Sequence, residues 1–231
     1  MKTKSTLYTV LIASLFFPII LNGQVENAKS GNNITDIDGN VYHTVIIGTQ
    51  TWMVENLKTT RYRNGDSIPN VTDGTTWTAL TTGAYCWYNN DEAANKAIHG
   101  ALYNYYSIAD SRNIVPTGWH VAAEADWATL TTFLGGESEG GGKLKESGSK
   151  NWKSPNTGAT NSSGFTALPG GCRSQYLGEF IKMGNYGLWW SSQASDPNYA
   201  WSRSLLYSNI SLTRGYSYKQ YGFSVRCVRD L

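Results

Sequence analysis

The chain has 231 residues, of which 40% are hydrophobic and 13% aromatic, a composition typical of a folded protein rather than a disordered one. Its 19 basic and 17 acidic residues give a formal net charge of +2. Proteins that bind nucleic acid usually carry clustered basic residues, whereas the lysines and arginines of this chain are scattered singly, so we exclude nucleic acid as a partner.

Residues 1–23 are predicted to be a secretory signal peptide. Lys2 and Lys4 supply a basic start, and an almost uninterrupted apolar stretch follows from Leu7 to Leu21. A short basic region followed by an apolar region of this kind is typical of signal peptides. A membrane-spanning helix needs roughly 20 consecutive apolar residues. We therefore expect the segment to be cleaved rather than kept as a membrane anchor.

Cleavage is expected after Gly23, with Ala28 as the alternative site. Gln24 stands where a bacterial lipoprotein would carry a cysteine. The predicted signal contains two lysines and no acid, so the mature chain, 24–231, carries 17 basic and 17 acidic residues and has no net charge. We expect a secreted, cell-surface or periplasmic protein that is neither a lipoprotein nor an integral membrane protein.

The mature chain is predicted to begin with a flexible polar leader, residues 24–33, followed by one domain, residues 34–231, which is long enough to bury a core. Asp38-Gly39 is a strong signal for a hairpin turn. Strands are predicted after it at Val41–Ile47 and Thr51–Val54.

Two amphipathic helices are predicted in the middle of the chain. Residues 101–110 carry apolar side chains at helical spacing, and so do residues 124–134, where acids occupy the first turn and two glycines follow the last. Residues 140–158 are rich in Gly, Ser, Thr and Asn and are predicted to form long loops.

The last third of the chain favours short strands. They are predicted at Phe165–Leu168, Gly187–Ser191, Ala200–Leu206, Ile210–Arg214 and Gly222–Val228. The expected fold class is therefore α+β, with two main helices against a small, mostly antiparallel sheet and with long loops.

The chain has three cysteines, Cys86, Cys172 and Cys227, and an exported protein meets conditions that permit disulfides. At most one bridge can form, and spacing alone leaves all three pairings open. No adjacent His or Lys indicates an activated thiolate, so we expect the remaining thiol to be a small buried side chain.

Eight motifs of the sequence resemble, in this order, those of the Fibrobacter succinogenes major paralogous domain family. They are Asp38-Gly-Asn-Val-Tyr, Ile47-Gly-Thr-Gln-Thr-Trp-Met-Val-Glu-Asn-Leu, Gly83-Ala-Tyr-Cys-Trp-Tyr-Asn-Asn-Asp, Gly100-Ala-Leu-Tyr-Asn, Pro116-Thr-Gly-Trp-His-Val, Ala167-Leu-Pro-Gly-Gly, Trp189-Trp-Ser-Ser and Tyr221-Gly-Phe-Ser-Val-Arg-Cys-Val. The resemblance extends from about Ile34 to Asp230. It implies a C-type-lectin-like fold, distantly related to the formylglycine-generating enzyme, and it implies no particular activity.

The sequence departs from the family pattern at two places. Val115 stands where members often carry Cys, so the resemblance implies a disulfide between Cys172 and Cys227 instead. Ala122-Ala123 stands where the pattern favours Pro followed by Ser or Thr, at the start of the 124–134 helix. Since the loss of an N-cap hydroxyl costs ~1 kcal/mol, we expect this helix start to fray.

The sequence gives little support for catalysis, a cofactor or a metal. The related oxidase binds copper with a closely spaced cysteine pair near the end of the chain, where this chain has Cys227 alone. Asp36–Asn40 lacks the downstream glutamate of a calcium loop and favours a polar hairpin turn. Glu124, Asp126, Glu137 and Glu139 are expected to be helix-terminal and loop charges rather than a glycosidase pair. We expect no catalytic residue, no cofactor and no metal site.

An aromatic, amide-rich region between residues 193 and 218 is the predicted ligand site, because sugar rings stack on aromatic faces while Asn and Arg bond their hydroxyls. The candidates are Trp201, Arg203, Tyr207, Asn209, Arg214, Tyr216 and Tyr218. Trp119, Trp189 and Trp190 are expected in the core. We predict a non-catalytic module that binds glycan or an extracellular protein. The alternatives are an assembly subunit of a surface structure and a divergent enzyme.

Overall fold

The computed structural model describes residues 29–230. The predicted signal peptide, residues 1–23, and the first part of the predicted leader lie outside this range. Within the described range, no helix combines the length and the apolar character needed to cross a membrane.

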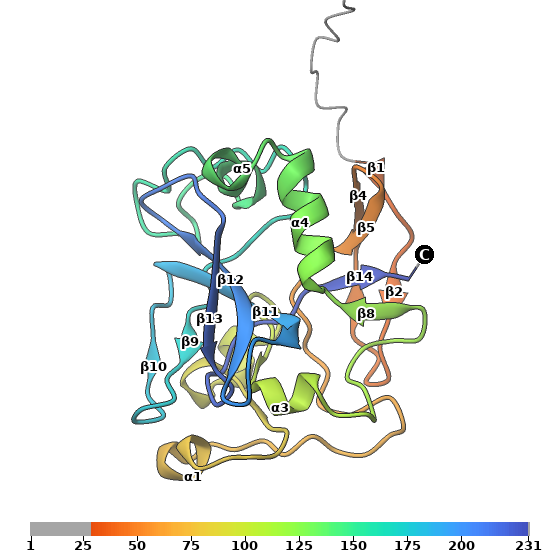
Figure 1. The fold of residues 1–231 in the computed structure, drawn as a ribbon, viewed down its shortest axis with the longest axis vertical. Coiled ribbons are helices and arrows are strands. Elements are labelled where there is room, and N and C mark those ends of the chain that lie inside the picture. The colour runs from red at the N-terminus through yellow and green to blue at the C-terminus, as the bar shows by residue number, and fades with distance from the viewer. Residues whose placement is uncertain (1–28, 231) are drawn as a thin grey trace, which may run out of the picture.

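Two antiparallel sheets form the frame of the molecule (Figure 1). The five-stranded sheet has the order β1 (Lys29–Ser30), β4 (Thr44–Ile47), β5 (Gln50–Met53), β14 (Cys227–Arg229) and β8 (Trp119–Val121). The three-stranded sheet has the order β11 (Tyr186–Ala194), β12 (Tyr199–Leu206) and β13 (Thr213–Tyr218). Three small hairpins are formed by β2 (Ile34–Thr35) with β3 (Val41–Tyr42), β6 (Tyr85–Cys86) with β7 (Leu102–Tyr103), and β9 (Cys172–Arg173) with β10 (Phe180–Ile181).

The two longest helices lie at one end of this frame, and α1 (Gly74–Thr78) lies at the opposite end (Figure 1). The two longest are α4 (Glu124–Phe133) and α5 (Glu137–Leu144). The other short ones are the 3-10 turn Tyr88–Asn90, α2 (Glu92–Asn95) and α3 (Tyr105–Ile108). The structure is thus α+β, as predicted, with antiparallel pairing between all the strands named above.

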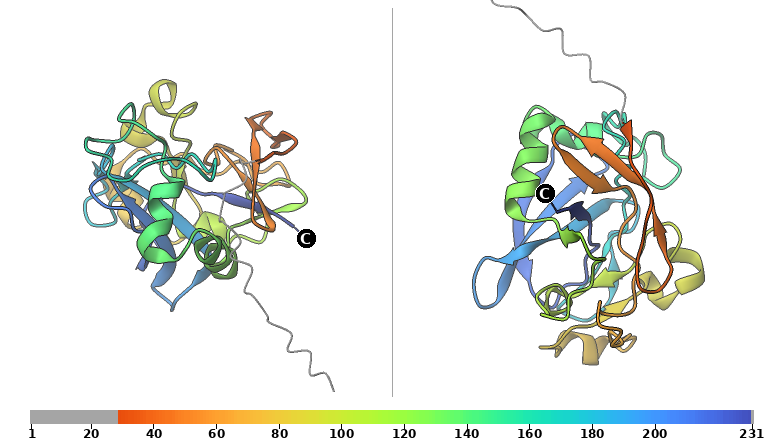
Figure 2. Two further views of the ribbon diagram at one scale, coloured as in Figure 1. Left: turned by 90° about the horizontal axis from the view of Figure 1, so that it is seen from above. Right: turned by 90° about the vertical axis from the view of Figure 1, so that its right-hand side faces the viewer.

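Helix α4 joins the two sheets through an aromatic cluster. The ring centroid of Trp127 lies 5.0 Å from that of Trp52 on β5 and 6.5 Å from that of Trp189 on β11. All three indoles are at most 1% exposed. In both views of Figure 2, α4 runs alongside the β11–β13 sheet. The prediction that Trp119, Trp189 and Trp190 belong to the core is confirmed.

A buried polar hub lies beside this cluster and is built from the motifs that carry the family resemblance. The Arg226 guanidinium donates to Asn56 Oδ1 (3.1 Å) and to the carbonyl oxygens of Met53 and Phe165 (both 2.8 Å). Trp189 Nε1 donates to the same Asn56 Oδ1 at 2.9 Å. The Asn56 and Arg226 motifs therefore have a structural role inside the domain.

The first predicted helix is mostly wrong. Only Tyr105–Ile108 is helical, because Leu102 and Tyr103 form strand β7 and the Asn104 side chain caps the short helix that follows. The backbone of Tyr103 exchanges two hydrogen bonds with Phe223, which is distant in sequence. A long-range pairing has overridden the local helical pattern.

The second predicted helix is confirmed as α4, but its start differs from the expectation of fraying. Asp126 Oδ2 accepts the Ala123 N–H at 2.8 Å, and the side-chain oxygen of Gln193 on β11 accepts the Glu124 N–H at 2.7 Å. These two acceptors replace the missing hydroxyl cap.

Residues 137–144 form helix α5, although residues 140–148 were predicted to open a loop. Its glycines permit a close approach to neighbouring backbone, since a Cβ on Gly141 would lie 2.5 Å from the Ser211 carbonyl oxygen and one on Gly142 would lie 2.5 Å from that of Gly158. The packing of this helix, rather than its intrinsic propensity, explains why it forms.

The strand predictions are partly confirmed. The turn at Asp38-Gly39 connects β2 to β3, and β5, β11 and β12 lie within two or three residues of the predicted ranges. The strand predicted at 41–47 is divided into β3 and β4, and β13 begins three residues later than predicted. Residues 165–168 contribute only an isolated bridge. Within 222–228, Gly222, Phe223 and Ser224 pair through single bridges, and β14 begins at Cys227.

The disulfide expected between Cys172 and Cys227 is not formed: all three cysteines are free and buried. Cys227 lies in the five-stranded sheet and Cys172 in the β9–β10 hairpin, each within apolar surroundings. The structure also differs in the predicted leader, because Lys29–Ser30 pairs with β4 as strand β1.

Candidate functional site

One face of the β12–β13 strand pair is aromatic. In an antiparallel pair, alternate residues share a face and lie opposite their partners. The register gives the cross-strand pairs Tyr199–Tyr218, Trp201–Tyr216 and Arg203–Arg214. This face therefore presents four aromatic rings followed by two arginines.

The rings are in continuous contact. Centroid distances are 4.2 Å for Tyr199–Tyr218, 5.5 Å for Tyr199–Tyr216 and 6.0 Å for Trp201–Tyr216. Tyr176, from a turn after β9, extends the row with a distance of 6.4 Å to Tyr218. We call these five residues, Tyr176, Tyr199, Trp201, Tyr216 and Tyr218, the aromatic face.

The aromatic face is accessible to solvent. Tyr216 is 62% and Tyr176 is 66% exposed, and the other three rings are partly exposed. All nine tryptophans of the chain lie within the described residues, and Trp201 is the one that is not buried. The buried ones are Trp52, Trp77, Trp87, Trp119, Trp127, Trp152, Trp189 and Trp190.

The rings are also held firmly in place. Most neighbouring rings meet edge to face, with interplanar angles of 88° for both Tyr199–Tyr216 and Trp201–Tyr216. Tyr176 also contacts the half-buried Tyr221 at 6.3 Å, which links the row to the core. A hydrogen bond with the neighbouring Tyr218 raises the pKa of Tyr199 to about 12.

An ion-pair cluster lies at one end of the aromatic face. Glu124, the first residue of α4, accepts from Arg203 Nη1 at 2.8 Å and from Arg214 Nε at 2.6 Å. The Arg203 side chain is 4% exposed and that of Arg214 is 43% exposed. The Arg214 guanidinium carbon lies 3.5 Å from the centroid of Trp201, which is a close cation–π contact.

Five of the seven predicted site residues are thus brought together. Three of them, Trp201, Tyr216 and Tyr218, belong to the aromatic face itself. Arg214 borders it, and Arg203 shares the same side of the sheet but is buried under the Glu124 contact, where its role is structural.

The other two candidates lie elsewhere. Tyr207 packs against the core cluster that contains Trp127, with the Lys153 ammonium 5.5 Å from its ring centroid. Asn209 forms a turn, in which its side-chain oxygen accepts the Ser211 N–H at 3.1 Å. Both follow β12, where the chain turns back toward α5, and neither belongs to the aromatic face.

Sequence reasoning missed Tyr199, Tyr176 and Glu124 as members of this region. Tyr199 could have been found, since it directly precedes the strand predicted at Ala200–Leu206 and lies two residues before Trp201, so a strand one residue longer places both on one face. Nothing in the local sequence marks Tyr176 or the contact of Glu124 with two arginines, because both depend on how distant segments pack.

The charged groups that could suggest catalysis have internal partners. Asp126 Oδ2 lies 2.9 Å from His120 Nε2, and Asp230 Oδ1 lies 2.7 Å from His120 Nδ1. These two carboxylates raise the pKa of His120 to about 9. Burial raises the pKa of the Cys86 and Cys172 thiols to about 12, so neither forms a thiolate at neutral pH.

No cluster of three or more His, Cys, Asp or Glu side chains suited to a metal ion occurs between residues 29 and 230. In the hairpin turn Asp36–Asn40, Asp36 accepts hydrogen bonds from the Asn40 side chain at 2.8 Å and from the Tyr42 hydroxyl at 2.6 Å. Asp38 accepts from Arg61 Nε at 2.5 Å. These carboxylates are committed to the turn.

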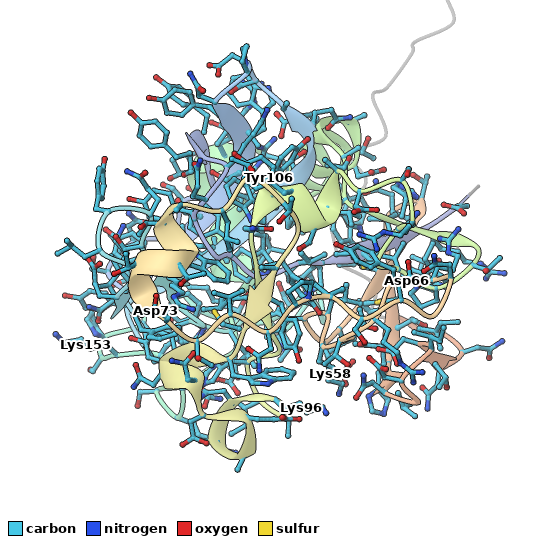
Figure 3. The ribbon with its side chains drawn as sticks, turned by 90° about the horizontal axis from the view of Figure 1, so that it is seen from below. Lys58, Asp66, Asp73, Lys96, Tyr106 and Lys153 are labelled. Atoms are coloured by element: carbon cyan, nitrogen blue, oxygen red, sulfur yellow. The ribbon has the colours of Figure 1, made fainter. Side chains whose placement is uncertain are left out.

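One depression of the described surface is lined by charged side chains of both signs. Lys58 and Lys96, labelled in Figure 3, line a depression of about 610 Å³ together with Asn40 and Glu92. Lys96 pairs with Glu92 at 2.8 Å. Since the labelled charges on this side have both signs, it forms a less distinctive surface than the aromatic face.

A family model described as the Fibrobacter succinogenes major domain matches residues 45–229. No curated protein and no solved structure shows a significant match to the chain.

Proposed function

The chain belongs to the Fibrobacter succinogenes major domain family, and from this premise we propose that it is an exported, non-catalytic binding module whose ligand surface is the aromatic face. We further propose a C-type-lectin-like fold. Two main helices packed on small antiparallel sheets with long irregular connections support that assignment.

The observation that carries the proposal is the exposure of a continuous row of aromatic side chains. Soluble proteins bury most large aromatic rings, and this chain buries eight of its nine tryptophans. A contiguous exposed patch of aromatic rings on an ordered sheet is a usual mark of a binding surface. The aromatic face therefore supports recognition rather than packing.

The chemistry of the aromatic face favours glycan as the ligand. Sugars combine C–H faces, which stack on aromatic rings, with hydroxyls that need hydrogen-bond partners. Four of the five rings are tyrosines, which supply both a ring face and a hydroxyl. Because neighbouring rings support each other, little side-chain entropy is lost on binding.

The proposal is tested on a glycan array with the purified chain, the Tyr216→Ala variant and a Phe133→Ala control. Phe133 is 55% exposed on α4, outside the aromatic face, so the control removes an exposed aromatic ring of similar size. We expect the wild type and the control to bind the same glycans and Tyr216→Ala to bind them at least about tenfold more weakly. An array on which the wild type retains no glycan would overturn the glycan assignment.

A second candidate function is that of an assembly subunit, and the edge of β13 favours it. Within residues 29–230, β13 pairs with β12 on one side only. Such an edge can pair with a strand of another chain. Sedimentation velocity across a range of concentrations distinguishes the two functions, because assembly through β13 predicts self-association or co-sedimentation with an envelope protein, whereas the glycan module sediments as a monomer.

A further inference from the structure

Arg214 differs from the other arginine beside the aromatic face in how its hydrogen-bonding capacity is used. Its Nε donates to Glu124 at 2.6 Å, and the central carbon of its guanidinium lies 3.5 Å from the centroid of the Trp201 ring. Its Nη1 and Nη2 groups have no hydrogen bond to the described part of the chain, and the side chain is 43% exposed.

The charge at this end of the aromatic face is not neutralised. One carboxylate, Glu124, serves two guanidinium groups, so the cluster has a net charge of +1. Arg203 is nearly fully buried, and Glu124 is its ion-pair partner there. The net positive charge of the cluster therefore reaches solvent at the exposed Arg214, and the N-terminus of the ten-residue helix α4 adds to it.

Arg214 lies next to the exposed ring of Tyr216 on the same face of β13. Arg214 and Tyr216 are two residues apart on β13 and so lie on the same face, about 7 Å apart along the strand. Tyr216 also contacts Trp201, on which Arg214 rests. A sugar ring stacked on Tyr216 is adjacent to the two free nitrogens of Arg214.

We propose that the aromatic face selects acidic glycans, and that Arg214 binds the carboxylate of a uronic-acid residue whose ring stacks on Tyr216. This inference rests on the proposed glycan-binding function. A guanidinium held by a close cation–π contact and by one ion pair offers its remaining donors in a fork that matches the two oxygens of a carboxylate. Neutral glycans leave the net charge of the cluster uncompensated.

The test compares polygalacturonate with its fully methyl-esterified form by isothermal titration calorimetry at low ionic strength. The two polymers share their backbone and differ in the carboxylate charge. We expect the wild type to bind polygalacturonate about tenfold more tightly than the ester, since a charge-assisted hydrogen bond distinguishes them. Alginate, which contains other uronates, serves as the second acidic probe.

Variants separate the two contributions. Arg214→Gln is expected to bind both polymers with the weaker affinity, and Arg214→Lys is expected to recover only part of the difference, because lysine keeps the charge but not the fork. Tyr216→Ala is expected to bind both polymers more weakly than the wild type does. Thermal unfolding of each variant confirms that it is folded before binding is measured.

Four results would overturn the inference. Equal affinities of the wild type for the acid and the ester, or an undiminished preference in Arg214→Gln, would remove the role of Arg214. If neutral glycans bind on the array but neither polygalacturonate nor alginate binds, the selection of acidic glycans is wrong. The proposed glycan-binding function would then still stand. A sulfated glycan that binds as tightly as the uronates would show that the site recognises negative charge in general. That result would also contradict selection of the carboxylate.

Discussion

Three arginines of this domain lie in different environments, which determine what each can do. Arg226 is fully buried and is bound by carbonyl oxygens and Asn56, and burial lowers its pKa to about 9. Arg203 is buried but paired with Glu124. Arg214 shares that carboxylate and remains exposed, so it alone of the three is available to a ligand.

Arg226→Met is therefore expected to destabilise the domain by about 3 kcal/mol, because it leaves Asn56 and two buried carbonyl groups without their donor. Arg214→Gln is expected to change stability by less than about 0.5 kcal/mol, as is usual at exposed positions. Urea unfolding followed by tryptophan fluorescence measures both. Similar losses for the two variants would contradict the assignment of Arg226 as a structural hub.

The three thiols provide a second prediction at the level of single residues. Because Cys86, Cys172 and Cys227 are free and buried, the folded protein is expected to react slowly with Ellman's reagent, and the unfolded protein to release all three thiols without prior reduction. Reducing agent should leave the melting temperature unchanged. Titration of a single thiol in the unreduced, unfolded chain would reveal the disulfide that the structure lacks.

Much of the aromatic face was predictable from single residues. Trp201, Tyr216 and Tyr218 were identified because aromatic and amide side chains are concentrated between residues 193 and 218. Tyr207 has the same residue type and lies close by, yet its ring packs against the core where the chain leaves β12. Composition could not distinguish Tyr207 from the exposed aromatic residues, because the difference depends on where β12 ends.

At the level of elements, the packing of α5 overrides the low helical propensity of its glycine-rich sequence. A Cβ on Gly141 would lie 2.5 Å from the Ser211 carbonyl oxygen, whereas one on Gly140 would first meet Leu134 Cβ at 3.4 Å. The helix is thus held close to the segment before β13. This explains why a glycine-rich sequence, which predicts a loop, is helical here.

Gly141→Ala is expected to cost about 1–3 kcal/mol through overpacking against backbone. Gly140→Ala is the matched control and is expected to be neutral or to stabilise the helix by up to about 1 kcal/mol, the usual gain from replacing glycine within a helix. Thermal unfolding of both variants provides the comparison. Equal effects of the two substitutions would show that α5 does not pack as closely as the structure indicates.

Helix α4 depends on a neighbouring strand for its first turn. Since Gln193 accepts the Glu124 N–H at 2.7 Å, Gln193→Ala is expected to cost about 1 kcal/mol, as for other lost N-caps. It should also loosen Glu124 and so weaken glycan binding through Arg214. A stability unchanged by Gln193→Ala would mean that Asp126 caps the helix alone.

The register of β13 was beyond sequence reasoning for a similar reason. The strand was predicted at 210–214 and occurs at Thr213–Tyr218. Residues 207–212 instead form a turn, in which the Leu212 N–H donates to the Glu137 carbonyl of α5. Only this turn places Tyr216 opposite Trp201, so the pairing on the aromatic face depends on a contact between distant segments.

At the scale of the whole molecule, α4 connects the two sheets. His120 links α4 to the segment that follows β14. His120 on β8 contacts Asp126 of α4 and Asp230 after β14. These carboxylates raise its pKa from an ordinary value of 6.5 to about 9, and the imidazolium in turn lowers the pKa of Asp126 against the effect of burial.

The raised pKa predicts the pH dependence of stability. A group whose pKa is higher in the folded state binds its proton more tightly there, so its contribution is complete below about pH 6.5 and is lost as the pH rises through 9. The melting temperature of the wild type should therefore fall over this interval more steeply than that of His120→Gln. Parallel curves for the two proteins would contradict a charged His120 in the folded state.

The central claim, that the aromatic face is the ligand surface, is tested most directly by acrylamide quenching of tryptophan emission. Eight tryptophans are buried, so quenching of the free protein should come mainly from Trp201 and should fall in Trp201→Phe. Saturation with a glycan selected on the array is predicted to reduce quenching of the wild type to the level of that variant. A glycan that binds by calorimetry while leaving Trp201 fully quenchable would place the ligand elsewhere and contradict the claim.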